Sequence, residues 1–380
     1  MSEFNQKLTT GTISIKIDDG EWKMSDLFSL AERRNPKRSF LFVSKILGKH
    51  IPVAPSVMRQ SYRDLAKKIS PLDQDGVLFI GMAETAVGLA AGVYEEASKN
   101  LTNSMLLTTT RHPVDGKLLG EFKEEHSHAT DHLIYSSVNN TKNNEPFSTY
   151  KTLVLVDDES TTGKTFINLI NSLFNNNIIY KNNIKEIIAV TITDWSRNRF
   201  QELNETGIEI KTVSLMTGDW EWKANPDARL PTMPNVNVSA MGDAKVSPKQ
   251  DWGRLGLQKY NNTKWLEKFN AQHGENILVL GTGEFLFPAF KAAEKMECQG
   301  ANVQFSSTTR SPISNGLAIE SSIAFTDNYG LGIPNYCYNV SHKNYDRIII
   351  CTETEPSFID VQLIDTLEKI SNKVEIAYYD

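Results

Sequence analysis

Two carboxylates stand between a hydrophobic run and a short hydroxyl-rich loop in residues 153–165, LVLVDDESTTGKT. The run LVLV predicts a buried strand, and Asp157 and Asp158 follow at its carboxyl end. Residues 160–165 lead into a helical pattern, so their backbone N–H groups would lie at a helix N-terminus, where a phosphate is favoured. Gly163 permits close approach of the backbone. Such a carboxylate pair can accept hydrogen bonds from the vicinal hydroxyls of a ribose whose 5′-phosphate fills the loop.

Two other interpretations of this stretch stay open. The residues 162–165, TGKT, match the end of the nucleotide-hydrolase pattern GxxxxGK[ST]. That pattern needs glycine at the place of Asp158, and two carboxylates beside a triphosphate would be electrostatically unfavourable. The remaining alternative is a strand, turn and helix with a structural role only.

The surrounding elements must place this loop at the edge of a sheet. Hydrophobic periodicity predicts helices over residues 61–69, 85–97 and 165–174 and strands over 76–81, 104–111, 153–156 and 184–195. This alternation predicts an α/β fold with a Rossmann-like parallel sheet, in which ligands bind beyond the carboxyl ends of the strands.

Two segments carry weaker patterns. Alternation around residues 13–17 predicts a strand, and a helical period through Leu27, Phe28 and Leu30 predicts a short helix after it. Residues 112–150 are polar and contain the run NNTKNNEP, which indicates a long mobile loop.

The acidic motif and the order of elements over about residues 60–200 resemble the type I phosphoribosyltransferases, whose motif binds phosphoribosyl diphosphate. The resemblance implies that Asp157 and Asp158 hold the ribose hydroxyls and that the loop after them holds the 5′-phosphate. The implied loop residues are Glu159, Ser160, Thr161, Thr162, Gly163, Lys164 and Thr165. It also implies Mg²⁺ that is carried by the substrate, without a ligand from the protein.

The same resemblance implies a diphosphate site at the ends of the two earlier strands. Its backbone loop would be Gly81, Met82, Ala83, Glu84 and Thr85. Arg111 would present a guanidinium, whose fixed paired donors suit that anion. Two alternatives stay open: Gly81 and Gly88 could only permit tight packing of a helix on the sheet, and Arg111 could form a salt bridge at the rim.

Residues 112–132 would then form the flexible lid of such an enzyme. Lys123, His126 and His128 would close over the leaving diphosphate, supply positive charge and exclude water. A metal site formed by His126, His128 and His132 is the alternative, although Mg²⁺ does not favour imidazoles and no cysteine joins them for zinc. A solvated polar loop is the third interpretation.

Composition supports a small ligand. The chain has 380 residues, 40 basic and 46 acidic side chains and a net charge of −6, so no broad cationic face indicates nucleic-acid or membrane-surface binding. Three cysteines without a CxxC pair exclude a disulfide framework and a zinc ribbon. With no signal-like N-terminus and no apolar run of about 18 residues, we expect a cytoplasmic protein.

A second α/β unit begins at Asn276, and its landmarks follow those of the first. GMAE at 81–84 parallels GTGE at 281–284, and TTRHP at 109–113 parallels TTRSP at 308–312. These pairs predict a diverged internal duplication, with two unrelated sheets as the alternative. The predicted boundaries are N-terminal elements over 1–60, a phosphoribosyltransferase domain over 61–216, a linker region over 217–270 and a second domain over 271–380.

The whole chain suggests a narrower resemblance. The segments GMAETAVGLA, EEHSHA and VDDESTTGKT, followed by Thr309-Arg310-Ser311-Pro312, resemble phosphoribosyltransferases with a C-terminal TRSP domain, encoded in bacterial tellurium-resistance and stress-response gene clusters. This resemblance implies a role in making a nucleoside-like metabolite from an unspecified acceptor. It also favours a homodimer, although no residue pattern shows one.

We therefore predict transfer of a phosphoribosyl group from phosphoribosyl diphosphate to a base-like acceptor. A non-catalytic nucleotide-binding regulator and a hydrolase of a phosphoribosyl compound are the alternatives. In the second unit Thr352 and Glu353 stand opposite Asp157 and Asp158, and no glycine-bearing loop follows, so we expect no phosphoribosyl diphosphate there. Arg310 could still hold an acceptor or a related anion, and a contact surface is the other reading of this unit.

Overall fold

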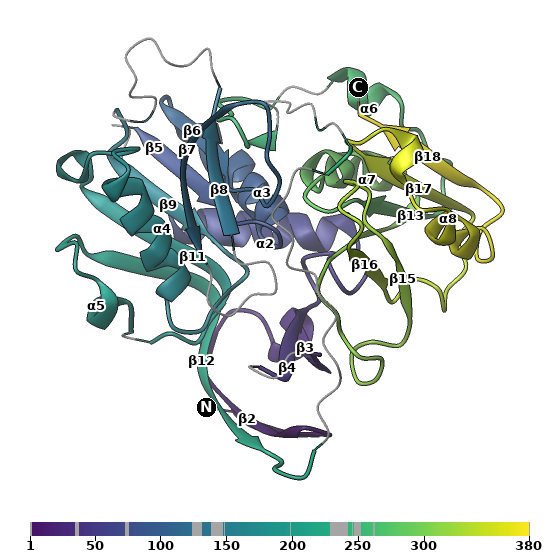
Figure 1. The fold of residues 1–380 in the computed structure, drawn as a ribbon, viewed down its shortest axis with the longest axis horizontal. Coiled ribbons are helices and arrows are strands. Elements are labelled where there is room, and N and C mark those ends of the chain that lie inside the picture. Colours follow the sequence, from purple (N-terminus) through teal and green to yellow (C-terminus); the bar gives the residue numbers. More distant parts are fainter. Residues whose placement is uncertain are drawn as a thin grey trace.

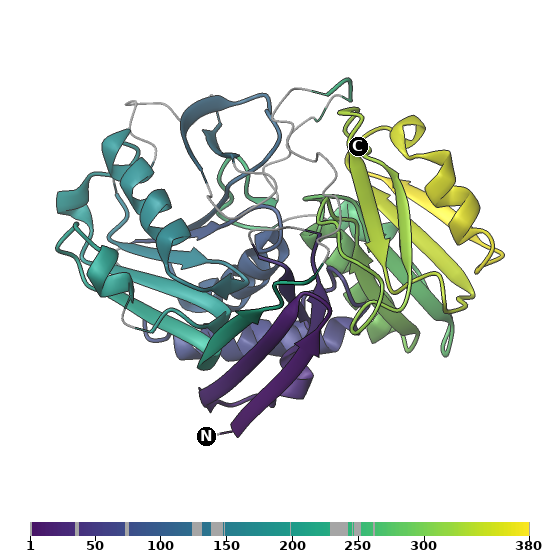
Figure 2. The same ribbon diagram turned by 60° about the horizontal axis from the view of Figure 1, so that its bottom comes forward.

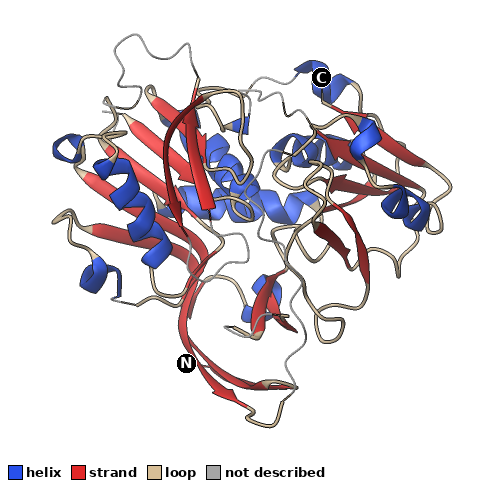
Figure 3. Cartoon of the chain, viewed as in Figure 1, coloured by secondary structure: helices blue, strands red, loops and turns tan. Residues whose placement is uncertain are grey.

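A computed structural model gives the arrangement of the chain. It describes residues 2–34, 38–72, 76–123, 131–137, 147, 149–197, 199–228, 242–244, 246, 252–260 and 263–379. Two sheets lie side by side in Figure 1, each flanked by helices (Figure 3). In the described part of the chain, no helix has the length and apolar character that crossing a membrane would need.

The larger sheet has the parallel centre that the sequence predicts. Its order is β1 (Ser2–Leu8), β2 (Gly11–Gly20), β12 (Ile210–Ala224), β11 (Glu186–Asp194), β9 (Thr152–Val156), β5 (Val77–Gly81) and β6 (Ser104–Thr108), and β10 (Glu159–Ser160) pairs with β11. The strands from β12 to β6 are parallel, whereas β1 and β2 join them antiparallel. Figure 2 shows these two N-terminal strands at the lower side of the molecule.

Helices cover both faces of the parallel strands, which explains why every residue of LVLV is buried. Val154 and Val156 face the core that includes α2 (Pro55–Lys68) and α3 (Val87–Ala97). Leu153 and Leu155 face the other core, with α4 (Lys164–Asn175). The remaining short helices of this half are α5 (Arg199–Leu203) and the 3₁₀ turns η1 (Ser98–Asn100) and η3 (Lys181–Asn183).

The predicted N-terminal helix is wrong beyond its first turn. A helix α1 spans only Met24–Leu27, and Phe28 and Leu30 lie in β3 (Phe28–Glu32), which pairs antiparallel with β4 (Phe40–Ser44). The ring of Phe28 packs edge-on against those of Phe42 and Trp195, at centroid distances of 5.0 and 5.7 Å. These tertiary contacts outweigh the helical spacing of the local sequence.

Residues 112–150 contain a hairpin where the sequence predicted a loop. Strand β7 (Lys117–Lys123) pairs antiparallel with β8 (Asp131–Ser136). The ring of Phe122 is buried and stacks on that of His132 at 4.4 Å. Since most of β7 is exposed, its hydrophobic alternation is weak. His126 and His128 lie outside the described residues.

The second sheet repeats the strand order of the first. Strands β14 (Asn302–Ser307), β13 (Asn276–Gly281), β17 (Arg347–Thr352) and β18 (Val374–Tyr378) are all parallel, in the order of β6, β5, β9 and β11. Tyr150 and Tyr345 each stand two residues before their strand, β9 or β17. This is the relation that an internal duplication predicts. The other elements are α6 (Thr263–Glu267), α7 (Phe287–Cys298), η5 (Pro356–Phe358), α8 (Val361–Leu367) and the hairpin of β15 (Ser322–Thr326) and β16 (Pro334–Tyr338).

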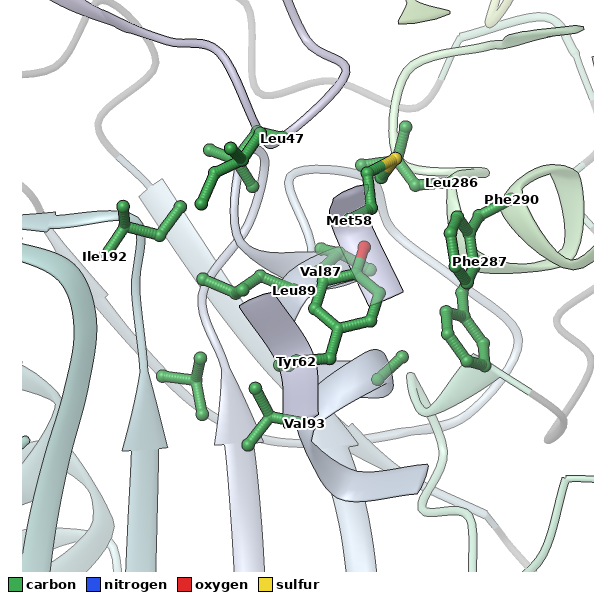
Figure 4. Packing of buried hydrophobic residues seen from close by; sticks show 14 of the residues in the cluster. Leu47, Met58, Tyr62, Val87, Leu89, Val93, Ile192, Leu286, Phe287 and Phe290 are labelled. Atoms are coloured by element: carbon green, nitrogen blue, oxygen red, sulfur yellow. The ribbon is translucent and has the colours of Figure 1, made fainter. Parts of the chain in front are cut away.

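The two halves share one hydrophobic core, where α2 and α3 meet α7 (Figure 4). The ring of Tyr62 lies edge-on to that of Phe290 at 5.3 Å. Gly92 makes this possible, because a Cβ there would come within 2.1 Å of the Tyr62 ring. Removing either aromatic ring would therefore loosen both halves together.

Parts of the predicted linker, residues 217–270, are packed structure. Strand β12 continues to Ala224 and pairs with β2. Farther on, Leu257 exchanges backbone hydrogen bonds of 2.8 Å with Leu106 of β6, and Thr108 N donates to Gly253 O at 2.9 Å. Residues 252–257 are thus tied to the edge of the larger sheet.

Candidate active site

A cavity of about 190 Å³ lies at the carboxyl ends of β5, β6 and β9. The residues around it come from three parts of the chain: the loops of the larger sheet, the N-terminal segment and the second domain. The sequence-predicted residues that line it are Ala83, Glu84, Thr85, Arg111, Asp157, Asp158, Glu159, Ser160, Thr161, Thr162, Gly163 and Thr165.

The carboxylate pair is fixed by the neighbouring strand. Asp157 N donates to Val190 O at 3.0 Å, and Ile192 N donates to Asp158 O at 3.0 Å. Asp158 N also donates to the Asp157 carboxylate at 2.9 Å. The backbone of both residues is therefore held by β11, while their half-buried side chains line the cavity.

The loop after the pair turns at Gly163 and opens α4. Gly163 has φ 78°, and a Cβ there would lie 2.9 Å from the Phe200 ring. The N-cap residue Gly163 has no side chain to cap α4, and Thr162 Oγ1 accepts only a long hydrogen bond of 3.3 Å from Lys164 N, so an anion can bind at this helix N-terminus. Ser160 is buried, and its Oγ has no hydrogen-bond partner among the described residues. Lys164 is exposed and does not line the cavity.

The loop after β5 is braced by the turn after β6. Ala83 N donates to Thr109 Oγ1 at 2.9 Å, and Arg111 Nη2 donates to Ala83 O at 3.1 Å. Gly81 and Met82 do not line the cavity. A Cβ on Gly81 would lie 2.4 Å from that of Ala90, so Gly81 permits close packing of α3 on β5.

The hairpin places its residues in two different surroundings. His132 lines the cavity, and its Nδ1 shares a hydrogen bond of 2.9 Å with Thr109 Oγ1. Lys123 lines a separate shallow hollow, where Asn168 Nδ2 of α4 donates to Lys123 O at 3.1 Å. The role of Lys123, His126 and His128 at the diphosphate stays a prediction. Among the described residues, no group of three His, Cys, Asp or Glu side chains could hold a metal ion.

The N-terminal segment supplies cavity residues that the sequence did not indicate: Arg33, Arg38, Leu41, Phe42, Ser44, Leu47 and His50. Arg38 Nη2 lies 2.7 Å from Glu159 Oε1, so the N-terminal segment is paired with the acidic motif. Burial, together with the charges of Lys49 and Arg33, lowers the pKa of His50 to about 3, which keeps its ring neutral. The basic cluster RRNPKR at 33–38 was the one signal for an anion site here.

The second domain reaches the cavity through Thr309, Arg310 and Ser311. Arg310 Nη2 lies 2.9 Å from His112 Nε2, and the His112 ring stacks on Tyr329 at 3.7 Å. Burial, aided by Arg310 and other guanidinium groups, lowers the pKa of His112 well below 6.5. His112 is therefore neutral, and its ring nitrogen can accept the hydrogen bond from Arg310.

A buried ion cluster lies behind this contact. The guanidinium of Arg254 bonds Glu284 at 2.8 Å and Glu353 at 2.8 Å, and all three side chains are about 1% exposed. Burial alone would raise the pKa of Glu284, but Arg254 and further donors hold it at about 2. Glu284 also accepts from Thr110 Oγ1 and Arg111 N, each at 2.6 Å. The second domain thus holds the turn that carries Arg111.

The fold thus brings a carboxylate pair, a hydroxyl-rich loop at a helix start and the turn of Arg111 to one cavity. The chain belongs to the phosphoribosyl transferase family, whose model matches residues 27–219, and the TRSP domain that follows this transferase matches residues 253–367. The family match and the strand order establish the predicted type I phosphoribosyltransferase fold with a second α/β domain.

Solved structures give weak similarity over part of the chain. Adenine phosphoribosyltransferase from Trypanosoma brucei is 14% identical, with a TM-score of 0.35 and coverage of 50% of this chain and 76% of that one. The enzyme from Rhodothermus marinus is 12% identical, with a TM-score of 0.32 and coverage of 50% and 93%. The UMP synthase of Leishmania donovani is 19% identical, with a TM-score of 0.26, and the match covers 42% of this chain but only 27% of that one. A search of curated proteins finds no significant match.

Proposed function

We propose that this protein transfers a 5-phosphoribosyl group from phosphoribosyl diphosphate to a ring nitrogen of a base-like acceptor and releases diphosphate. One observation carries the proposal. The carboxylate pair, the uncapped start of α4, the loop after β5 and Arg111 come from separate parts of the chain and line one cavity. Family membership supports a transferase that uses this donor.

Each group has a role in binding the donor. The amides at the start of α4 and the Ser160 hydroxyl bind the 5′-phosphate, and Asp157 and Asp158 accept hydrogen bonds from the ribose hydroxyls. The amides of Glu84 and Thr85 and the Arg111 guanidinium bind the diphosphate, while Ala83 N stays bonded to Thr109. The bond from ribose C1 to the diphosphate oxygen breaks, and the acceptor lone pair forms the new bond to C1. Catalysis then depends on positioning and on stabilising the charge of the leaving group.

Mg²⁺ enters as part of the substrate. The hard carboxylate oxygens beside the cavity, on Glu84, Asp157 and Asp158, would suit such an ion, which would neutralise charge on the leaving group. We propose that the substrate carries this ion and that the protein provides no separate metal site.

The acceptor is assigned to the side of the cavity formed by the N-terminal segment. Leu41, Phe42 and Leu47 are apolar, and Arg38 and the neutral His50 stand beside them. Such a surface suits a planar ring with polar edges. From the resemblance to TRSP-containing transferases, we further propose that the product is a nucleoside-like metabolite linked to tellurium resistance and stress response.

Calorimetric titration tests the proposed donor. The full-length protein is titrated with phosphoribosyl diphosphate and Mg²⁺, then with ATP and Mg²⁺, and compared with the Asp157→Asn, Asp158→Asn double variant. We expect binding of the first ligand only, and its loss in the double variant. Preference for ATP, or an unchanged affinity in the variant, would contradict the assignment.

A further inference from the structure

The turn that carries Arg310 is built in the same way as the turn that carries Arg111. Gly283 N donates to Thr308 Oγ1 at 2.8 Å, just as Ala83 N donates to Thr109 Oγ1 at 2.9 Å. In each unit the arginine follows two residues after that threonine. The second domain thus presents a guanidinium in the position that Arg111 has in the first.

The two turns meet across the junction in a reciprocal arrangement. Glu284, from the loop after β13, accepts from the turn of Arg111. In the opposite direction, Glu84, from the loop after β5, has its Oε2 at 4.0 Å from Arg310 Nε. Arg310 therefore lies beside the loop that is assigned to the diphosphate, and both Arg310 and Glu84 line the cavity.

The Arg310 guanidinium keeps donors for a further anion. Among the described residues, only the His112 ring accepts from it, with Nη2 at 2.9 Å from Nε2 and 3.4 Å from Nδ1, whereas 4.0 Å to Glu84 is too long for a hydrogen bond. A guanidinium has five N–H donors, and Arg310 is only 5% exposed. Glu84 cannot be its full counterion, because Lys49 Nζ lies 2.7 Å from the same carboxylate.

Arg310 also lacks a close carboxylate partner among the described residues. It is buried, and the nearest described carboxylate oxygen is Glu84 Oε2, at 4.0 Å from its Nε. An incompletely compensated buried charge is costly. A bound anion would lower that cost.

We propose that Arg310 of the TRSP segment binds the diphosphate of the donor together with Arg111, so that the second domain completes the site of the first. This inference rests on the proposed function. His112 is then a positioning residue, because it holds the Arg310 guanidinium at the rim of the diphosphate loop. Two forked donors that line one cavity suit the two phosphoryl groups of one diphosphate.

Two fragments of the donor separate the diphosphate site from the ribose phosphate site. Pyrophosphate with Mg²⁺ and ribose 5-phosphate are each titrated calorimetrically into the full-length wild type, Arg310→Gln, Arg310→Lys and the control Lys343→Gln. Lys343 is exposed, belongs to the same domain and does not line the cavity. We expect Arg310→Gln to weaken pyrophosphate binding about ten- to a hundred-fold, the range for a lost charged hydrogen bond.

The Arg310→Lys variant and the titration with ribose 5-phosphate show whether the effect is specific to the diphosphate site. Arg310→Lys should lie between wild type and Arg310→Gln, and the affinity for ribose 5-phosphate should be the same in all four proteins. Unchanged pyrophosphate affinity in Arg310→Gln would overturn the inference while leaving the transferase proposal intact. Equal weakening of both fragments in both Arg310 variants would also overturn it. If the wild type binds neither fragment, the proposed function itself fails.

Discussion

The loops after β9 and β17 occupy equivalent places in the two sheets. The loop after β9 borders a cavity, whereas polar groups of the loop after β17 are bonded to side chains of the protein itself. After β9, Gly163 opens α4 without a capping side chain. After β17, the carboxylate of Asp360 accepts from Gln362 N at 2.8 Å and caps α8. The N-terminus that could bind a phosphate in the first unit is satisfied by the chain itself in the second.

The acidic residues of the two loops differ in the same way. Asp157 and Asp158 line the cavity, whereas Glu353 is buried against Arg254 and accepts from the Tyr329 hydroxyl at 2.8 Å. The two units therefore share a strand order, whereas the acidic residues at their strand ends have different surroundings. The loops after β9 and β17 differ in whether the protein itself supplies counterions for the acidic residues at the strand ends.

The largest effect, on stability, should come from removing Arg254, the buried cation that neutralises Glu353 after β17. Arg254→Met leaves Glu284 and Glu353 buried without their cation, and we expect a loss of about 3–5 kcal/mol in the free energy of unfolding. Urea unfolding measures it. The control Arg63→Met removes a half-exposed arginine 3.7 Å from Glu96 and should cost about 1 kcal/mol at most. Equal losses in the two variants would show that the cluster does not hold the junction.

A smaller effect, on ligand binding rather than on stability, should come from a change in the loop after β9. Asp158→Asn should raise the dissociation constant for phosphoribosyl diphosphate about ten- to a hundred-fold, because a charged acceptor of the ribose hydroxyls is lost, with little change in melting temperature. Glu355→Gln, an exposed change in the second loop, should leave binding unchanged. Calorimetry should also give one donor per chain; two donors per chain would contradict the comparison.

The sequence was sufficient for the parts of this comparison that depend on local pattern. Buried runs and helical spacing located β5, α3, β6, β9, α4 and β11, and the acidic motif indicated eight of the residues that line the cavity. The hairpin of β7 and β8 was missed because its exposed strand carries little alternation. Phe28 and Leu30 were misassigned because their conformation depends on Phe42 and Trp195, which are distant in sequence.

The contributions of distant segments to the site could not be predicted for the same physical reason. Arg38 reaches Glu159 across 121 residues, and Arg310 reaches His112 across 198 residues. Such contacts are set by how the domains pack, for which one sequence gives no periodic signal. The basic cluster at 33–38 and the TTR repeat showed which residue types were present but not which cavity they would reach.

Acid should weaken the N-terminal segment, through His50, and the junction between the domains, through Glu284, in different pH windows. The pKa of His50 is about 3 in the folded protein against 6.5 when exposed, so only the unfolded chain takes up this proton as the pH falls below 6.5. The cost is about 2 kcal/mol at pH 5. Glu284, with its pKa lowered from 4.5 to about 2, adds its own loss only below pH 4.5. His112 acts in the same direction as His50.

Unfolding measured between pH 7 and pH 4 tests these windows. His50→Gln should flatten part of the fall in stability between pH 6.5 and 4.5, and His112 contributes to the slope that remains. The exposed His273→Gln serves as the control and should follow the wild-type curve. A His50→Gln curve parallel to wild type over this range would show that the His50 ring is not held neutral in the folded protein.

The smallest effect concerns the one glycine that the loop after β9 has and the loop after β17 lacks. Gly163→Ala places a Cβ at φ 78° and 2.9 Å from the Phe200 ring, so we expect a loss of about 1–2 kcal/mol in stability together with weaker binding of ribose 5-phosphate. Gly207→Ala separates the two causes, because Gly207 has φ 75° but nothing within 4 Å of an added Cβ. That control should lose stability alone. If Gly163→Ala also keeps its affinity for ribose 5-phosphate, the turn at Gly163 does not form the phosphate site, and the difference between the two loops must lie in the carboxylates.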